Sequence, residues 1–340
     1  MVSVTVRHCF QYLWGFMHSN CNDVEVILAQ PRGFCAGVER AVAILDMIVD
    51  QYIASKEVYV LHEIVHNAYV VESFRKRNVK FVASLDEVPT GAVLVFSAHG
   101  VAKQVRAAAQ ERGLVVIDAT CPLVTKVHLE IHRYHKNGYR IILIGHKGHR
   151  EVEGSMGQIQ SEVLLVQNVD DVYNLQVDAA TKLAYVTQTT LSVDDTRVIV
   201  EALKTRFPDI VGPDLKDICY ATQNRQTAVK ELASMVDVML IMGGKNSSNT
   251  NRLLDLAKVR NPRSFLIGSY EDVDLSWFAD TKKIGVTAGA SAPAILVEEL
   301  LKYFSSKMNI KVSTMDGVRE NIVFKLPNLN ESSHSFSSNA

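Results

Sequence analysis

Three cysteines in the chain share one local context. Cys35, Cys121 and Cys219 each stand directly before a segment whose apolar residues recur at helical spacing, and they are 86 and 98 residues apart. Cys121 follows a β-branched run, so it is expected at the junction of a strand and a helix. Unpaired backbone N–H groups at a helix start favour the thiolate, the form of cysteine that binds metals. The recurring context therefore predicts a threefold repeat that brings three thiolates together.

Three thiolates at equivalent positions favour a metal centre, although a single buried cysteine is usually only a small core residue. Zinc sites normally use closely spaced pairs such as C-x2-C, and the sequence has no such pair. An iron–sulfur cube held by three thiolates leaves one iron open to bind a substrate oxygen and deliver electrons. The compact cysteine runs of ferredoxins are also absent, so spacing alone leaves the kind of centre open. Cys9 and Cys21 lie outside the repeat, and we assign them no role.

Imidazole, hydroxyl and amide side chains follow the ends of the predicted strands. Together with N–H groups at helix starts, they offer the neutral or switchable donors that suit a phosphate or diphosphate. Taken singly, each has a simpler interpretation, since a Ser or Asn before a helix is usually only an N-cap. The residues of this polar rim are His66, His99, His149, Ser247, Ser248, Asn249 and Ser291.

Two acids follow the strand predicted at residues 141–144. Glu151 or Glu153 can donate a proton there, although an arbitrary glutamate in a loop is rarely catalytic. Glu153 precedes Gly154 and is expected to be structural. Glu151 is therefore the candidate general acid.

Short apolar strands alternate with helices along the chain, and the order of strand, cysteine, helix and polar-ended strands occurs three times. This pattern predicts an α/β fold with parallel sheets that are covered on both faces. We expect three similar parallel-sheet domains in a pseudo-threefold arrangement around a central cavity. In open α/β sheets the site lies at the carboxyl ends of the strands, which is where the polar residues fall.

The order of the segments predicts the domain boundaries. A leader at 1–22 is expected to be disordered or to reflect a mis-assigned start, with Met17 as the alternative first residue. Residues Ile322 to Phe324 are expected to dock as a short strand. The expected units are α/β repeats at 23–120, 121–216 and 217–305, a segment at 306–327 that folds back over the first domain, and a disordered tail at 328–340.

The bulk composition excludes some functions. With 36 basic and 37 acidic side chains among 340 residues, the chain has no net field that would bind a nucleic acid. No apolar run approaches the roughly 18 residues that indicate a membrane span. Five dispersed cysteines make a poor disulfide framework and fit a reducing compartment. We expect a cytoplasmic protein with neither a nucleic acid nor a membrane as partner.

The candidate residues lie within longer motifs of the chain. These motifs are Pro31–Val38, His66-Asn67, Ser97–Val101, Asp118–Val124, Gly148–Gly154, Thr187–Ser192, Ile218–Thr222, Asn246–Asn249 and Thr287–Ser291. Together they closely resemble the IspH/LytB family of 4-hydroxy-3-methylbut-2-enyl diphosphate reductases. The resemblance runs from about Val24 to Phe324, and it departs at Arg150, where the family more often has proline.

The resemblance implies a role for each candidate residue. Cys35, Cys121 and Cys219 would hold a 4Fe-4S cluster whose fourth iron binds the substrate hydroxyl. Glu151 and Thr189 would form a proton relay, with His149 beside them in the catalytic set. The residues implied to bind the substrate and its diphosphate are His66, His99, His149, Thr189, Ser247, Ser248, Asn249 and Ser291.

The implied reaction is the last step of the methylerythritol phosphate route to isoprenoids. It is a two-electron reductive dehydroxylation of (E)-4-hydroxy-3-methylbut-2-enyl diphosphate to isopentenyl and dimethylallyl diphosphates. Electrons would come from a ferredoxin or flavodoxin, and ultimately from NADPH. The chain has no dinucleotide fingerprint, so NADPH itself is not expected to bind.

Two other classes remain open. One is a non-redox iron–sulfur dehydratase that uses the open iron only as a Lewis acid, and the other is a cluster-bearing sensor without turnover. Electron uptake coupled to loss of water distinguishes a reductase from a dehydratase, and any turnover of an allylic diphosphate excludes a sensor.

Overall fold

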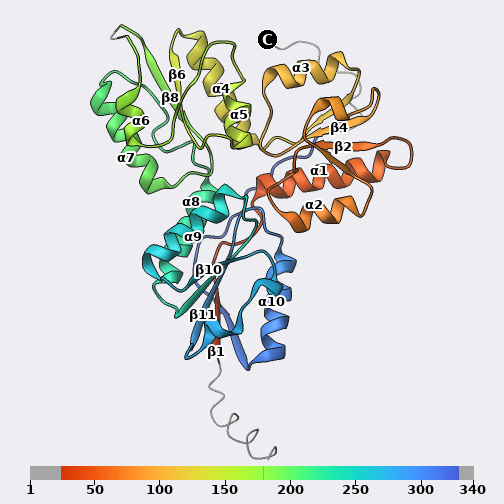
Figure 1. Ribbon diagram of the computed structural model, residues 1–340, viewed down its shortest axis with the longest axis vertical. Coiled ribbons are helices and arrows are strands. Elements are labelled where there is room, and N and C mark those ends of the chain that lie inside the picture. Colours follow the sequence, from red (N-terminus) through yellow and green to blue (C-terminus); the bar gives the residue numbers. More distant parts are fainter. Residues whose placement is uncertain (1–23, 179, 329–340) are drawn as a thin grey trace, which may run out of the picture.

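The computed structural model describes residues 24–178 and 180–328, and it shows three lobes, each built on its own parallel sheet (Figure 1). The expected α/β fold with three parallel-sheet units is confirmed. The leader expected at 1–22 and nearly all of the expected tail lie outside the described residues. No helix in the described part of the chain is long and apolar enough to cross a membrane.

The first lobe contains a sheet of order β3-β2-β4-β5, in which all strands are parallel. Both central strands are fully buried four-residue apolar runs, because helices cover both faces of the sheet. The elements are α1 (Ala36–Tyr52), β2 (Val58–Leu61), α2 (Ala68–Arg75), β3 (Lys80–Val82), η1 (Leu85–Glu87), β4 (Val93–Phe96), α3 (Lys103–Glu111) and β5 (Val115–Asp118).

The second lobe contains a parallel sheet of order β7-β6-β8. Its core packs the apolar faces of its helices against strands that are buried on both sides. The elements are α4 (Pro122–Lys136), β6 (Arg140–Ile144), α5 (Arg150–Met156), β7 (Leu164–Val166), α6 (Val169–Asn174), β8 (Leu183–Thr187) and α7 (Val193–Arg206).

The third lobe combines the two ends of the described chain. Its parallel sheet has the order β10-β9-β11-β1-β12, so the first strand lies between two of the last. The elements are β1 (Val24–Leu28), α8 (Tyr220–Ala233), β9 (Val238–Met242), α9 (Ser248–Arg260), β10 (Ser264–Ile267), η2 (Tyr270–Asp272), η3 (Leu275–Phe278), β11 (Lys283–Ala288), α10 (Ala294–Lys307) and β12 (Ile310–Thr314).

Two expectations about the ends of the chain are wrong. The unit expected at 23–120 includes β1, yet β1 pairs with β11 and β12 in the third sheet. Hydrophobic periodicity identifies a buried strand but does not say which sheet it joins. Residues 322–324 form no strand, and the strand near this end is β12 instead. The residues after β12, 315–328, are irregular, and we call them the carboxy-terminal segment. This segment reaches the first lobe, where Arg40 Nε donates to the carbonyl of Lys325 at 2.9 Å.

Candidate active site

A cavity of about 100 Å³ lies where the three lobes meet, and all twelve candidate residues line it. Each lobe contributes residues that follow the carboxyl ends of its strands, as expected for parallel sheets. The candidates are Cys35, His66, His99, Cys121, His149, Glu151, Thr189, Cys219, Ser247, Ser248, Asn249 and Ser291.

The three cysteines occupy equivalent places. Each is the N-cap of a helix, namely α1, α4 and α8. The backbone N–H of Cys121 donates to the carbonyl of Ala98 at 3.0 Å, that of Cys219 to Thr189 at 3.1 Å, and that of Cys35 to Ala290 at 3.2 Å. Each acceptor stands two residues beyond the end of a strand, β4, β8 or β11. The threefold relation among the cysteines is thus carried by backbone hydrogen bonds.

These bonds anchor each cysteine to a different lobe from the one that contains the helix it caps. Cys35 is anchored to the third lobe, Cys121 to the first and Cys219 to the second. Cys121 closely follows a strand of the lobe that anchors it. Cys219 is preceded by turns, and Cys35 is preceded by a loop that leads from β1. The expected strand-to-helix junction therefore holds fully at Cys121 alone.

Burial has a larger effect on the pKa of these thiols than the N–H groups at the helix starts have, and it makes the thiols less acidic. It raises the pKa of Cys121 to about 12 and that of Cys219 to about 11, and it also raises the pKa of Cys35. Nearby backbone N–H groups lower each value, as expected, but by less than burial raises it. Without a metal the thiols stay protonated, so metal binding must displace their protons.

The three thiols line one cavity, and Gly37 lies against two of them. A Cβ at position 37 would lie 2.4 Å from Cys121 Sγ and 3.9 Å from Cys35 Sγ, so a larger residue there would displace the Cys121 side chain. In the described residues no group of three or more His, Cys, Asp or Glu side chains is arranged to hold a metal ion. Cysteine sulfurs are nevertheless the ligands that hold iron–sulfur clusters.

Three histidine rings form a cluster at one side of the cavity. The ring centroids of His66 and His99 are 4.1 Å apart and stacked, while His149 lies 5.4 and 5.8 Å from them. Burial lowers the pKa of His149 to about 4 and that of His99 well below its ordinary value. The N–H of Glu151 donates to Nδ1 of His149 at 3.2 Å, so neutral His149 carries its proton on Nε2 and can donate it to an anion.

The hydroxyl and amide groups come from the N-terminal end of α9 and from the loop before α10. Ser291 Oγ donates to the carbonyl of His66 at 3.1 Å, which joins the third lobe to the first. Ser247 caps α9 by accepting from the Thr250 N–H at 3.3 Å, so its simpler role as an N-cap also holds. Asn249 differs, since both polar atoms of its side chain are buried without a hydrogen-bond partner. Such a pair of unsatisfied atoms indicates a missing ligand.

Glu151 is a buried acid with one partner residue. Only 3% of it is exposed, and its oxygens accept from the Thr189 backbone N–H at 2.6 Å and the Thr189 hydroxyl at 2.9 Å. Burial raises its pKa to about 7, against the lowering effect of Thr189. Glu153 is instead half exposed and pairs with Arg150 at 2.8 Å. Glu151 thus lines the cavity, while Glu153 lies at the surface.

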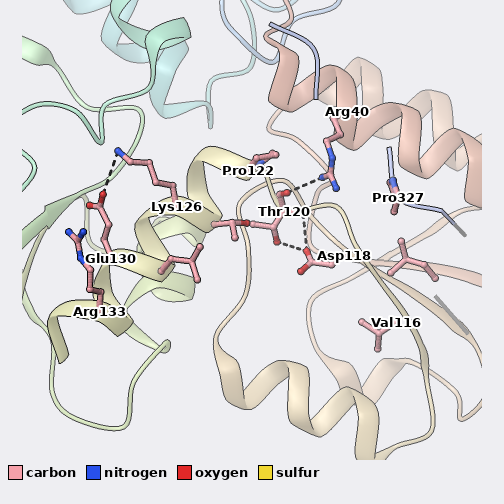
Figure 2. A pocket seen from close by; sticks show the side chains of 12 residues that line it. Arg40, Val116, Asp118, Thr120, Pro122, Lys126, Glu130, Arg133 and Pro327 are labelled. Carbon is pink, nitrogen blue, oxygen red and sulfur yellow. Dashed lines mark hydrogen bonds and ion pairs between the residues drawn. The ribbon is translucent and has the colours of Figure 1, made fainter. Parts of the chain in front are cut away.

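A larger hollow of about 580 Å³ contains none of the twelve candidates. It lies on the outer side of the loop that leads into Cys121, between α1 and α4 (Figure 2). Arg40 crosses it to donate to the carbonyl of Thr120 at 3.1 Å. The smaller central cavity is the candidate active site because it gathers the titratable and ligating groups.

A family model described as LytB protein matches residues 26–305.

The chain belongs to the LytB family.

Two curated relatives of the chain are both named "4-hydroxy-3-methylbut-2-enyl diphosphate reductase". The protein of that name from Anaplasma marginale (strain St. Maries) is 65% identical over 315 residues, which cover 93% of this chain and 91% of the relative. The one from Wolbachia pipientis wMel is 56% identical over 308 residues, which cover 90% of this chain and all of the relative.

Solved structures of LytB proteins share the fold. The structure of the E-1-hydroxy-2-methyl-but-2-enyl-4-diphosphate reductase from Plasmodium falciparum matches with a TM-score of 0.86 and 37% identity, over 92% of this chain and 98% of that one. A structure described as (E)-4-hydroxy-3-methyl-but-2-enyl diphosphate reductase, the terminal enzyme of the non-mevalonate pathway, matches with a TM-score of 0.62 and 32% identity, over 83% of this chain and 99% of that one.

Sequence reasoning missed several residues around the LytB cavity. Arg225 is fully buried and bonded to the loop before Cys35, although arginines on helices are usually exposed. Glu63 accepts from the Asn246 side chain at 2.7 Å and from His66 at 3.1 Å, which links the first and third lobes. No local pattern marks either residue, because their partners are distant in the sequence.

Proposed function

We propose that this LytB protein is 4-hydroxy-3-methylbut-2-enyl diphosphate reductase, an oxidoreductase of isoprenoid precursor synthesis. It would reduce the allylic alcohol to isopentenyl and dimethylallyl diphosphates, consuming two electrons and two protons and releasing water. The observation that carries the proposal is that three thiols, a rim of histidine, serine and asparagine side chains, and a buried acid line one cavity. The names of relatives at 55–65% identity support the same activity.

Cys35, Cys121 and Cys219 would hold a 4Fe-4S cluster with one iron free of protein ligands. When bound, the cluster supplies the electrons and a Lewis acid for the substrate oxygen. The raised pKa values of the thiols mean that loading releases protons. The glycine at position 37 keeps the space beside two of the sulfurs free.

Glu151 would supply the proton to the departing hydroxyl. A pKa of about 7 leaves a substantial protonated fraction near neutral pH, where a carboxyl of ordinary pKa would be ionised. The Thr189 hydroxyl donates to Glu151 and also lines the cavity. Thr189 is therefore placed to pass a proton between the acid and the substrate oxygen.

The polar rim would hold the diphosphate and exclude water. His149 Nε2, the serine hydroxyls and the Asn249 amide offer donors from all three lobes. Contacts between lobes, such as Ser291 with the carbonyl of His66, close the cavity around the ligand. A fixed diphosphate would position the allylic carbon next to the acid and the cluster.

A ferredoxin or flavodoxin would supply the electrons, and NADPH would be their ultimate source. The activity assay uses anaerobic protein, the allylic diphosphate and such a reduced donor. We expect two electrons consumed for each isopentenyl or dimethylallyl diphosphate formed. Product formation without electron consumption would indicate the dehydratase, and binding without turnover would indicate the sensor.

Asn249→Ala is expected to weaken substrate binding by at least about tenfold. A hydrogen bond to a charged ligand contributes about 1.5–3 kcal/mol, and the amide of Asn249 has no other partner. For the same reason, the substrate-free variant should be no less stable than the wild type. Calorimetric titration and thermal unfolding measure the two effects.

Asn261→Ala is the matched control for Asn249. Asn261 is also buried, but its amide donates to the carbonyl of Val236 at 2.8 Å and its oxygen accepts from the Arg263 N–H at 2.9 Å. This control should lose stability and keep its affinity for the substrate. Unchanged substrate affinity in Asn249→Ala would contradict the assignment.

Substrate binding is expected to take up protons, so affinity should fall as pH rises. Burial keeps His99 and His149 neutral at pH 7, because it lowers the pKa of both. A bound diphosphate favours their charged forms and raises both pKa values.

Calorimetry in two buffers with different ionisation enthalpies measures the uptake of protons. His149→Asn should reduce it, while His128→Asn, which alters a buried histidine outside the cavity lining, should not. Binding without proton uptake would contradict this prediction.

A further inference from the structure

One buried arginine ties the backbone beside two of the cysteines. Arg225 is 1% exposed, and its Nε and Nη2 donate to the carbonyl of Gly33 at 3.0 and 2.8 Å. Nη2 also donates to the carbonyl of Phe34, the residue before Cys35, at 3.1 Å. Nη1 donates to the carbonyl of Ala221 at 2.9 Å, at the start of α8. A single guanidinium thus joins the loop of the first cysteine to the helix that the third one caps.

Glu320 of the carboxy-terminal segment completes the partners of Arg225. Both carboxylate oxygens lie 3.1 Å from Nη1 of Arg225, and the Asn224 amide donates to one of them at 3.0 Å. The Glu320 side chain is only 13% exposed. Every nitrogen of the guanidinium has an acceptor, which a buried cation requires.

A second arginine links the same segment to the remaining cysteine. Arg40 Nη1 donates to the carbonyl of Thr120 at 3.1 Å, and Thr120 directly precedes Cys121 (Figure 2). Arg40 Nε donates to the carbonyl of Lys325 in the carboxy-terminal segment. Arg225 therefore bonds to the backbone near Cys35 and Cys219, and Arg40 bonds to the backbone beside Cys121. Both arginines also bond to the carboxy-terminal segment.

We propose that Arg225 and Arg40 are positioning residues for the iron–sulfur centre, and that the carboxy-terminal segment anchors them and sets the local charge through Glu320. The proposal rests on the proposed function, which assigns the centre to the three cysteines. The guanidinium of Arg225 favours the more negative, reduced state of a nearby cluster, and Glu320 opposes it. The pair would thus tune the reduction potential as well as the fit of the cluster.

Glu320→Gln isolates the effect of charge. Glutamine keeps an oxygen that accepts from Arg225 but removes the negative charge. We expect the full-length variant to bind the cluster and to have a more positive midpoint potential, measured by anaerobic redox titration of its electron paramagnetic resonance signal. Asp316→Asn, an exposed change of the same charge in the same segment, should leave the potential unchanged. Equal potentials in both variants would overturn the role of Glu320.

Arg225→Gln tests the positioning role through iron retention. Loss of groups that orient metal ligands typically costs about 10–100-fold in metal affinity, so we expect chelators to remove iron from this variant at correspondingly lower concentrations. Arg225→Lys keeps the charge and should recover part of the loss. Arg319→Gln, an exposed change of the same kind, should match the wild type. Wild-type iron retention and potential in Arg225→Gln would overturn the proposal.

Arg40→Gln gives a second test if Arg225→Gln fails to fold. It should weaken iron retention without unfolding the chain, and wild-type retention would refute the role of the carboxy-terminal segment beside Cys121. Failure of the proposed function can be distinguished from failure of the positioning proposal. If Cys121→Ser keeps the wild-type cluster spectrum, the proposed function fails. If Cys121→Ser loses the cluster but the arginine and Glu320 variants match their controls, only the positioning proposal fails.

Discussion

Replacing Cys121 with serine is expected to remove the iron–sulfur centre and abolish reductive turnover. The thiol is partly buried and lies against Gly37, and no other described cysteine stands near enough in sequence to take its place. Serine keeps the size and the N-cap position but is a poor ligand for iron. The same result is expected for Cys35→Ser and Cys219→Ser. Iron content and the visible absorption of anaerobically purified protein measure the loss.

Cys9→Ser and Cys21→Ser are the controls for the cysteine series. Both residues lie outside the described part of the chain, and the sequence analysis gives them no role. Each variant should keep the iron content and the colour of the wild type. An equal loss of the centre in either control would show that the ligands have been assigned wrongly.

Glu151→Gln is expected to slow turnover by about 10²–10⁴-fold, the usual contribution of a positioned general acid. Hydroxide is a poor leaving group, so a proton must reach the oxygen as the C–O bond breaks. Glutamine matches glutamate in size and still accepts from Thr189, but it has no proton of suitable acidity to give. The cluster and the affinity for the substrate should remain, and single-turnover kinetics with a pre-reduced enzyme would isolate the effect.

Glu153→Gln is the matched control for the acid. Glu153 lies on the same short helix, but it is half exposed and paired with Arg150. Its replacement should reduce the rate far less than that of Glu151. The reverse order of the two effects, with full clusters in both proteins, would assign the proton donor to Glu153.

The pH dependence of the wild type follows from the same carboxyl. Burial raises the pKa of Glu151 from its ordinary value to about 7, so the proton-donating form is lost as pH rises through 7. Turnover should decline over that range. The stabilising effect of the protonated carboxyl is likewise complete below its ordinary pKa and disappears as pH rises through 7. Glu151→Gln should remove this loss of stability between the ordinary carboxyl pKa and about pH 7 in thermal unfolding, and an unchanged slope would contradict the raised pKa.

The sequence was sufficient to predict which residues line the cavity, because parallel strands direct their carboxyl ends to one place. Polar residues such as His99 and Ser291 stand three residues after the ends of apolar strands, and the structure keeps this local order. Cys121 was predicted from the same kind of local pattern, because β5 precedes it and α4 follows it. Features that depend on local order in the chain could therefore be predicted.

Features that depend on distant partners could not be predicted. The residues of β1 form the same apolar pattern whichever sheet they join, so the strand was expected in the first unit although it pairs with β11. The acidity of Cys121 was expected to increase, but it depends on burial, which tertiary packing decides. Glu320 lies in the segment that was expected to fold back over the first domain, but the sequence does not show that it faces Arg225.

The placement of β1 has a consequence for biosynthesis. Cys35 and β1 leave the ribosome first, yet their partners in the third sheet and at Ala290 are made about 250 residues later. Domains generally fold in the order of their synthesis, so the first two lobes can form while β1 remains an unpaired apolar edge. The thiol of Cys35 can join the other two only after nearly the whole chain has been translated. Insertion of the proposed cluster would therefore follow the synthesis of nearly the whole chain, and a nascent chain stalled before β11 would not hold it with all three proposed ligands.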